Sequence, residues 1–238
     1  MIKKFITLFK LGRKIAGSDI LEIISKFQKP PLAITLLFKF LAISFSPKKK
    51  GSIKSEGERL SDSLESMGTT FIKLGQFLAT RPDIIGESLS KQLENLQDKL
   101  PPFPLIQAQE IIKNDLGQET YNSIINLSEP VAAASIAQVH KAQINDNGTI
   151  KDVAIKILRP NIKKIFNDEI DAIMLFAFLV ESFIKKTKRL KLVEVVFLLK
   201  EITNLEMDLR FEAAAANEYA ENTKNDVGFR VPEIYWNF

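Results

Sequence analysis

The stretch from Val131 to Pro160 constrains the fold of this chain more than any other segment. It contains two runs in which apolar residues alternate with other residues, and these runs flank the turn-forming tetrapeptide Asn145-Asp146-Asn147-Gly148. The second run, Val153 to Lys156, ends on a lysine. Because strands on both sides of such a turn pair with each other, the pattern predicts a β-hairpin over roughly Ala134 to Leu158.

Composition limits the chemistry that the chain can perform. With 238 residues, 45% of them apolar, it can bury the core of one large domain or of two small ones. The chain contains no cysteine, which excludes disulfides, thiolate nucleophiles and cysteine-ligated zinc. The chain has a single histidine, His140, so it has almost no residues from which to build a histidine-based metal site or a Ser-His-Asp triad. We interpret His140 as a strand residue facing a neighbour. Chemistry must therefore depend on Lys, Asp, Glu, Asn and backbone groups.

The distribution of charge argues against nucleic acid as a partner. The formal net charge is +4, but 29 acidic residues are interleaved with 33 basic ones. The sequence has no long basic stripe alternating with aromatic residues, which is the pattern typical of a nucleic-acid interface.

The first fifty residues have two interpretations. From Ile2 to Phe45 the pattern is helical, apolar and basic, with a break at Lys29-Pro30-Pro31. This segment could be an amphipathic helix pair packed on the body of the protein, or an interfacial anchor whose lysines contact anionic headgroups. The apolar stretch from Leu32 to Phe45 is too short to predict a transmembrane helix, and Lys39 interrupts it. We therefore expect a cytoplasmic protein that contacts a membrane surface.

The remainder of the chain is mostly helical in pattern. Apolar residues recur at three- and four-residue spacing between residues 55 and 80, which predicts one helix ended by Pro82. Further helices are expected at residues 87–99, 104–115, 161–186 and 192–222. The run from Phe229 to Trp236 resembles a strand, and Asp226-Val227-Gly228 before it is interpreted as a turn. Together with the hairpin, these elements predict an α+β fold in which helices surround a small antiparallel sheet.

The lysine that ends Val153-Ala154-Ile155-Lys156 either extends from a sheet face into solvent or points into a site. In protein kinases the same four letters mark the third strand, whose lysine pairs with the phosphates of ATP and with a helix glutamate. The position of the kinase glycine-rich loop is then taken by Ala132, Ala133, Ala134, Ser135, Ile136, Ala137, Gln138 and Val139. Alanine adds a Cβ that largely forbids positive φ, so this loop is expected to be stiffer than a glycine loop. Alternatively, these small residues only pack a strand against a neighbouring helix.

Three motifs together resemble a known family. Lys73-Leu74-Gly75-Gln76 looks like its KxGQ motif, residues 132–139 look like its alanine-rich nucleotide loop, and Glu206-Met207-Asp208 looks like its ExD motif. On these residues the chain resembles the UbiB/ADCK family of atypical protein-kinase-like proteins linked to coenzyme Q, from about residue 55 to the C-terminus.

The resemblance implies roles for individual residues. Lys156 would hold phosphates, Glu212 would orient Lys156, and residues 132–139 would cover the nucleotide, which is expected to be ATP or ADP with Mg²⁺. Lys73 and Gln76 would gate the pocket, and Glu206 would pair with Lys73. If residues 192–222 form one regular helix, Asp208 and Glu212 share a face, whereas Glu206 lies about 120° around the helix from Glu212. One lysine could then not easily pair with both glutamates. The simpler alternative is that all these charges belong to solvated helix faces.

The resemblance also implies a domain division and a function. We expect amphipathic, membrane-associated helices at residues 1–50, the KxGQ extension at 51–127, and an incomplete kinase-like N-lobe at 128–238. The catalytic and metal-binding loops of the family follow the region near Phe229, so this chain is expected to lack the C-lobe and to be inactive alone. The implied function is support of ubiquinone biosynthesis at the inner face of a bacterial membrane, with lipid or ubiquinone precursors and other ubiquinone-biosynthesis proteins as partners. The alternative is a non-catalytic helical scaffold or membrane-surface adaptor.

Overall fold

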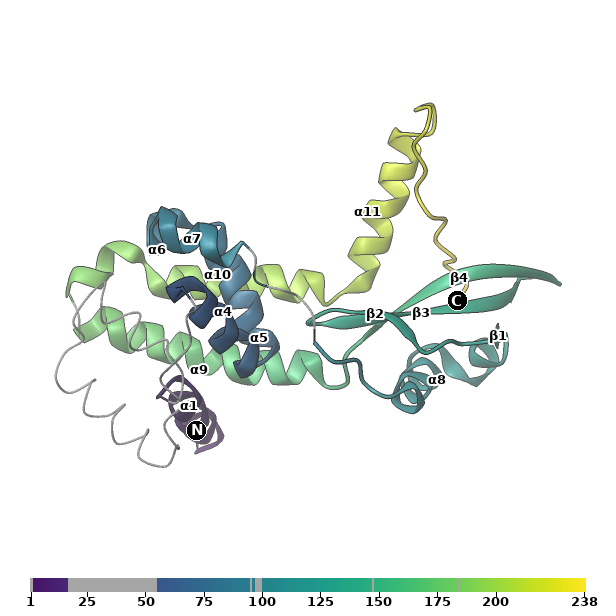
Figure 1. Cartoon of the computed structure of the whole chain (residues 1–238). Coiled ribbons are helices and arrows are strands. Elements are labelled where there is room, and N and C mark those ends of the chain that lie inside the picture. Colours follow the sequence, from purple (N-terminus) through teal and green to yellow (C-terminus); the bar gives the residue numbers. More distant parts are fainter. Residues whose placement is uncertain (1, 17–54, 95, 97–99, 147, 184) are drawn as a thin grey trace. The chain divides into compact units, whose positions relative to one another are not determined.

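The computed structural model describes residues 2–16, 55–94, 96, 100–146, 148–183 and 185–238 (Figure 1). The chain divides into two compact units. Unit 1 consists of residues Met1–Asp98 and Lys164–Lys200, and unit 2 consists of Lys99–Lys163 and Glu201–Phe238. Together the units combine helices with one small antiparallel sheet, which confirms the predicted α+β class.

Unit 1 is helical throughout its described part. Its helices are α1 (Ile2–Ala16), α4 (Glu56–Met67), α5 (Thr69–Ala79), α6 (Pro82–Ile85), α7 (Glu87–Leu93), the 3₁₀ turn η1 (Lys185–Leu190), most of α9 (Ile162–Phe183) and the first part of α10 (Leu192–Glu206). Through η1, α9 leads into α10, and the two helices run in opposite directions (Figure 1). An ion pair between Lys200 and Asp171 at 3.0 Å joins them.

The single helix predicted for residues 55–80 is wrong, because the structure divides it into α4 and α5. Gly68 separates them with φ at +101°, a backbone conformation that residues with a Cβ rarely adopt. The amide of Gly68 donates to Glu65 O and closes the end of α4, while Ser55 and Glu58 form a capping box at its start. Pro82 does not end the helix, since α5 already stops at Ala79 and Pro82 begins α6.

Helix α5 packs closely against its neighbours through the glycine of the Lys73-Leu74-Gly75-Gln76 motif. Gly75 is buried, and a Cβ added there would lie 2.5 Å from Leu96 Cδ2 and 2.7 Å from Leu64 Cδ1. Phe71 and Ile72 on the same helix are also buried. The small size of residue 75 therefore allows the side chains of Leu64 and Leu96 to approach the helix backbone.

Unit 2 is built on a four-stranded antiparallel sheet. Its strands are β1 (Ile124–Ile125), β2 (Pro130–Ala133), β3 (Ala137–Asp146) and β4 (Thr149–Leu158). Strand β3 is central: β4 pairs with one of its edges, and β1 and β2 pair with different parts of the other. The predicted hairpin is confirmed as β3 and β4, which pair from Asp146↔Thr149 at the turn to Ala137↔Leu158 at the open end. The pairing of β1 and β2 with β3 was not predicted.

One face of this sheet is covered by α8 (Leu105–Asn122), which has a kink at Gly117. The cluster between them contains Phe103, Ala108 and Ile112 from the helical side and Ile157 from β4, with Ile155 packed against it. Because successive side chains of a strand point to opposite faces, Ala154, Lys156 and Leu158 must point away from α8. The second face of the sheet is therefore the one that carries Lys156.

The long helix predicted for residues 192–222 is also wrong, because it is two helices, α10 and α11 (Leu209–Asn222). Asp208 lies between them with φ −105° and ψ 92°, and its side chain accepts a hydrogen bond from the amide of Arg210 as the N-cap of α11. Asp208 and Glu212 therefore do not share a helix face. The calculated 120° separation of Glu206 from Glu212 does not apply either, because it assumed an unbroken helix.

The segment predicted as a strand from Phe229 to Trp236 forms no strand in the structure. It is held by side chains instead: Tyr219 packs edge-on against Phe229 with ring centroids 5.2 Å apart, and Lys151 of β4 lies 4.8 Å from the ring centre of Tyr235. Gly228 before it has φ at +81°, in agreement with the predicted turn. Apolar alternation alone was therefore not enough to form a strand.

None of the helices in the described ranges combines the length and the apolar character needed to cross a bilayer. Most of the predicted membrane-associated segment, residues 17–54, lies outside the described residues. The predicted three-part domain division consequently stays a prediction.

Candidate functional site

Lys156 is the centre of the candidate site. It lies near the end of β4, opposite Val139 of β3, on the sheet face away from α8. Its side chain is 38% exposed. A ligand can therefore reach this ammonium without any displacement of the core.

The structure brings Lys156 together with Glu212, the pairing that the family resemblance implied. The ammonium of Lys156 donates to Oε2 of Glu212 at 2.6 Å and to Oε1 at 2.8 Å. Glu212 lies in the first turn of α11, where the helix dipole favours a carboxylate. The two residues belong to the same unit, so this contact lies inside unit 2.

A row of small side chains lies beside the pair. Ala132 of β2 is paired with Val139, and Val139 is paired with Lys156, so all three residues lie on the same sheet face. Ala154, two positions before Lys156, has the same orientation. Lys141, opposite Ala154, lies on the same face, which therefore carries small apolar side chains between two lysines, Lys156 and Lys141.

The predicted alanine loop is only partly a loop. Ala132 and Ala133 belong to β2 and Ala137 begins β3, which leaves a short turn at Ala134-Ser135-Ile136. The amide of Ala134 donates to the carbonyl of Ala137 at 2.8 Å and closes the turn. Of the eight residues, four are buried in the structure, namely Ser135, Ile136, Ala137 and Gln138. A ligand on this face would therefore meet Ala132 and Val139 before the rest of the segment.

Buried polar groups support the turn from the opposite sheet face. Gln138 accepts from the amide of Phe103 at 2.9 Å and donates to its carbonyl at 3.1 Å. Gln138 Nε2 also lies 2.9 Å from His140 Nε2, and His140 Nδ1 lies 2.8 Å from the carbonyl of Ser128. Because a carbonyl can only accept, Nδ1 carries the proton and Nε2 accepts from Gln138. His140 is thus a buried strand residue contacting its neighbours, as expected, and the sequence pattern did not reveal this network.

Asp208 has a structural role that its sequence position did not indicate. Its carboxylate forms a two-point ion pair with Arg210, at 2.8 Å to Nε and 2.6 Å to Nη2, in addition to its capping hydrogen bond. The hydrogen bond from the Arg210 guanidinium lowers the pKa of Asp208 to about 2, with further contributions from the Arg210 amide and from the charge of Lys163. Asp208 therefore stabilises the start of the helix that carries Glu212.

The remaining predicted residues lie on other helices. Lys73 and Gln76 are half-buried in α5 of unit 1, and Glu206 is the exposed last residue of α10 in unit 2. The predicted pairing of Lys73 with Glu206 stays a prediction. Across the described residues, no group of three or more His, Asp or Glu side chains could hold a metal ion.

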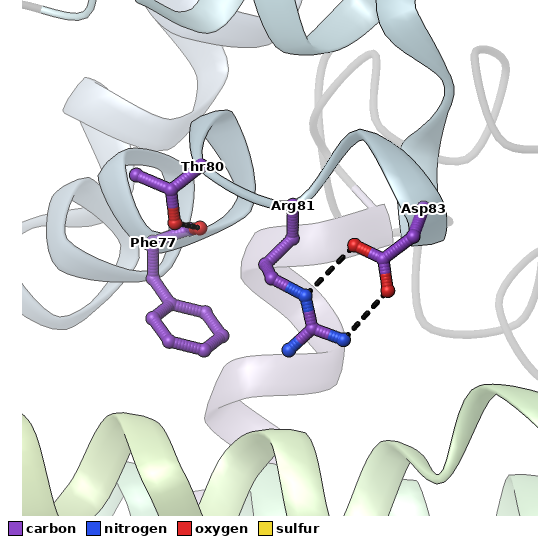
Figure 2. Close-up of polar contacts among 4 residues, drawn as sticks. All are labelled: Phe77, Thr80, Arg81 and Asp83. Atoms are coloured by element: carbon purple, nitrogen blue, oxygen red, sulfur yellow. Dashed lines mark hydrogen bonds and ion pairs between the residues drawn. The ribbon is translucent and has the colours of Figure 1, made fainter.

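Unit 1 contains a cavity of about 420 Å³ next to the α5–α6 turn, η1 and α10. Figure 2 shows the turn: Thr80 Oγ1 donates to the carbonyl of Phe77, and Arg81 forms a two-point ion pair with Asp83. The hydrogen bonds between Arg81 and Asp83 raise the pKa of Arg81 and lower the pKa of Asp83. None of the residues predicted to bind nucleotide lines this cavity.

Comparison with known proteins decides the family. The family described as ABC1 atypical kinase-like domain matches residues 95–238, which include the whole sheet, Lys156 and Glu212. The chain belongs to this family. The resemblance predicted from the three motifs is therefore confirmed.

Several relatives of this ABC1-family chain carry the name Probable protein kinase UbiB. The protein of that name from Marinobacter nauticus is 38% identical over 185 residues, covering 77% of this chain and 33% of the relative. The one from Cellvibrio japonicus is 36% identical over 209 residues, covering 87% and 36%, respectively. The one from Pseudomonas paraeruginosa is 32% identical over 235 residues, covering 98% and 43%. The chain thus spans from 33% to 43% of the length of these relatives.

Proposed function

We propose that this chain supplies the nucleotide-binding face of a UbiB-like atypical kinase or ATPase. The single observation that carries the proposal is the two-point contact of Lys156 with Glu212 on an accessible sheet face. In kinases an equivalent Lys–Glu pair holds the lysine where it can reach nucleotide phosphates. The expected ligand is ATP or ADP with Mg²⁺, in which the metal neutralises phosphate charge.

The donor groups of Lys156 fit a phosphate. An ammonium has three N–H donors, and the two oxygens of Glu212 occupy two of them. No further acceptor contacts Lys156 among the described residues. The third donor can therefore face a phosphate oxygen while Glu212 prevents the long side chain from rotating freely.

The surface beside Lys156 fits the apolar part of a nucleotide. Ala132, Val139 and Ala154 carry no side chain longer than valine, so a flat base could lie against this part of the sheet next to the ammonium. Lys141, opposite Ala154, adds a second cation to the same face. The turn at Ala134-Ser135-Ile136 contains no glycine, and its Cβ atoms restrict how closely phosphates approach its amides. We infer that Lys156, rather than loop amides, is the main phosphate-binding group of this chain.

A binding experiment tests the proposal. Titration of Mg·ADP into the chain should give saturable heat, and Lys156→Ala should weaken the affinity at least about tenfold, since a charge-assisted hydrogen bond contributes on that scale. Lys224→Ala is a matched control, because Lys224 also pairs with an exposed glutamate of α11, Glu221, at 3.3 Å. Equal affinity of the Lys156 variant and the unaltered chain would refute the proposal.

Under this proposal, the full-length protein supports ubiquinone biosynthesis by ATP hydrolysis or by phosphotransfer to a small or lipid-like substrate. The resemblance assigns Lys73 and Gln76 to gating of the nucleotide pocket and Glu206 to pairing with Lys73. A Lys73→Ala variant with unchanged nucleotide binding and turnover would count against the gating role. Ubiquinone precursors and other proteins of that biosynthesis are the proposed partners.

A second candidate function, a membrane-surface adaptor, is favoured by one observation on α1. Ile6 and Phe9 are each 50% exposed, and the exposed Lys10 lies on the same helix. Such a helix can insert apolar side chains into a lipid boundary while a lysine beside them contacts anionic headgroups. Binding to anionic vesicles that is lost in Ile6→Ser/Phe9→Ser, together with no binding of Mg·ADP, would favour the adaptor. Binding of both ligands is compatible with a nucleotide-binding protein at a membrane surface.

A further inference from the structure

Arg159 connects two segments of unit 2 that are far apart in sequence. Its guanidinium donates to the carbonyl of Ala134 from both Nε, at 3.0 Å, and Nη2, at 2.8 Å. The same group donates to the carbonyl of Pro101 at 3.0 Å and to that of Leu100 at 3.3 Å. One side chain therefore joins the alanine turn to the proline-rich segment that precedes α8.

The backbone of Arg159 strengthens the same connection. Its amide donates to the carbonyl of Ile136 at 2.9 Å, so the turn residues Ala134 and Ile136 are both held by residue 159. Gln138 holds the other end of the proline-rich segment through its two hydrogen bonds with Phe103. The segment from Leu100 to Phe103 is thus held at two points. Arg159 directly follows β4, the strand that carries Lys156, and Gln138 is the second residue of β3, just after the turn.

The chemistry of this connection requires arginine. A guanidinium is planar, with donors in a fixed fork, and it can bond three carbonyls that lie in different directions. A lysine has a single nitrogen on a flexible stem, and it could not reach Leu100, Pro101 and Ala134 with the same geometry. Because the carbonyl of Ala134 accepts from two guanidinium nitrogens, the guanidinium determines the direction of the peptide at the start of the turn.

We propose that Arg159 is a positioning residue that fixes the alanine turn against Leu100 to Phe103 and thereby sets the affinity for nucleotide. The nucleotide part of this inference rests on the proposed function. Arg159 does not itself contact the ligand. It holds the turn that connects β2, which carries Ala132, to β3, which carries Val139, so the apolar surface beside Lys156 depends on it.

Two measurements on the same variants test the inference. The variants are Arg159→Ala and Arg159→Lys, with Arg230→Ala as the matched control because Arg230 is exposed in the same unit. The first measurement is amide hydrogen exchange at Ala134, whose amide bonds to the carbonyl of Ala137. The second is the dissociation constant of Mg·ADP. Amides in the pairing of Ala142 with Val153 serve as an internal reference for the sheet as a whole.

Exchange at Ala134 should rise about tenfold or more in Arg159→Ala and to a smaller extent in Arg159→Lys, with the reference amides unchanged. The dissociation constant of Mg·ADP should rise about tenfold in Arg159→Ala. If Arg159→Ala does not fold, Arg159→Lys carries both measurements, with circular dichroism to confirm its fold.

The outcomes separate this inference from the proposed function. Unchanged exchange at Ala134 overturns the inference whether or not nucleotide binds. Faster exchange with an unchanged dissociation constant also overturns it, because the turn would then not set the affinity. If the unaltered chain binds no Mg·ADP, the proposed function fails together with the nucleotide part of this inference, while faster exchange at Ala134 still supports the role of Arg159 in fixing the turn.

Discussion

The Nζ atom of Lys156 lies 2.6 Å from Oε2 of Glu212, although 56 residues separate the two in sequence. The side chains are 38% and 59% exposed, so solvent screens the attraction between them. Exposed ion pairs contribute about 0–1 kcal/mol to stability. The pair therefore does little for folding, and its value lies in the fixed position that it gives to the ammonium.

Replacement of Glu212 by glutamine should separate these two effects. In Glu212→Gln, the free energy of unfolding should change by less than about 1 kcal/mol, since the ion pair is exposed. The affinity for Mg·ADP should fall by about tenfold because Lys156 is no longer held in place. Chemical denaturation and calorimetric titration measure the two quantities, and Glu221→Gln on the same helix is the control. A large loss of stability without a change in affinity would show that the pair is structural.

Gln138 should be essential for stability, unlike its neighbour Gln143. Gln138 is buried. Gln138→Leu removes the hydrogen-bond partner of three groups, namely the Phe103 amide, the Phe103 carbonyl and His140 Nε2. We expect a loss of about 1–3 kcal/mol in the free energy of unfolding. Gln143→Leu changes only exposed hydrogen bonds with Asn126 and Asp152 and should cost less than about 0.5 kcal/mol. Urea denaturation of both variants checks this difference, and equal losses would contradict it.

Gly75 should not tolerate a methyl group, although it lies in a helix. Helix propensity alone would make Gly75→Ala more stable by up to about 1 kcal/mol. The added Cβ would lie 2.5 Å from Leu96 Cδ2 and 2.7 Å from Leu64 Cδ1, and both leucines are buried. We expect overpacking to win and the free energy of unfolding to fall by about 1–3 kcal/mol. A gain of stability in thermal denaturation would show that the two leucines move aside easily.

Asp208 should titrate well below an ordinary aspartate. The hydrogen bond from the Arg210 guanidinium lowers its pKa from 3.8 to about 2. A carboxyl group whose pKa is lower in the folded state stabilises the fold above its ordinary pKa, and this contribution is lost as the pH falls towards 2. Carbon-detected NMR titration should therefore find a midpoint near 2 in the unaltered chain, and a higher one in Arg210→Ala. The same midpoint in both would mean that Arg210 is not the cause.

The parts of the fold that the sequence predicted are those with strong local signals. The turn at residues 145–148 and the alternation beside it predicted β3 and β4, and the kinase-like strand placed Lys156 near a glutamate of a later helix. The three motifs predicted the family, which the comparisons confirm. In these cases the pattern of a few neighbouring residues, or of short motifs in a fixed order, contains the required information.

The missed features depend on contacts between segments distant in sequence. Nothing in the pattern of residues 192–222 shows that Asp208 caps a new helix, because its ion pair with Arg210 is visible only in the fold. The strand predicted at 229–236 has the right alternation but does not join the sheet, although β4 pairs with β3 along only one of its edges. The interactions of Arg159 with Leu100 and Ala134 likewise join segments that no short motif connects. Only the break at Gly68 had a local signal, a glycine in the middle of a helical pattern.

An NMR titration of the chain with Mg·ADP tests directly whether this sheet face binds nucleotide. We expect amide shifts to change around Ala132, Val139 and Lys156, on the sheet face that points away from α8, and the changes to saturate with ligand concentration. Amides near Ile112 in α8 should change little. Shift changes confined to the cavity around Arg81 and Lys191, or no changes at all, would contradict the claim that this sheet face binds nucleotide.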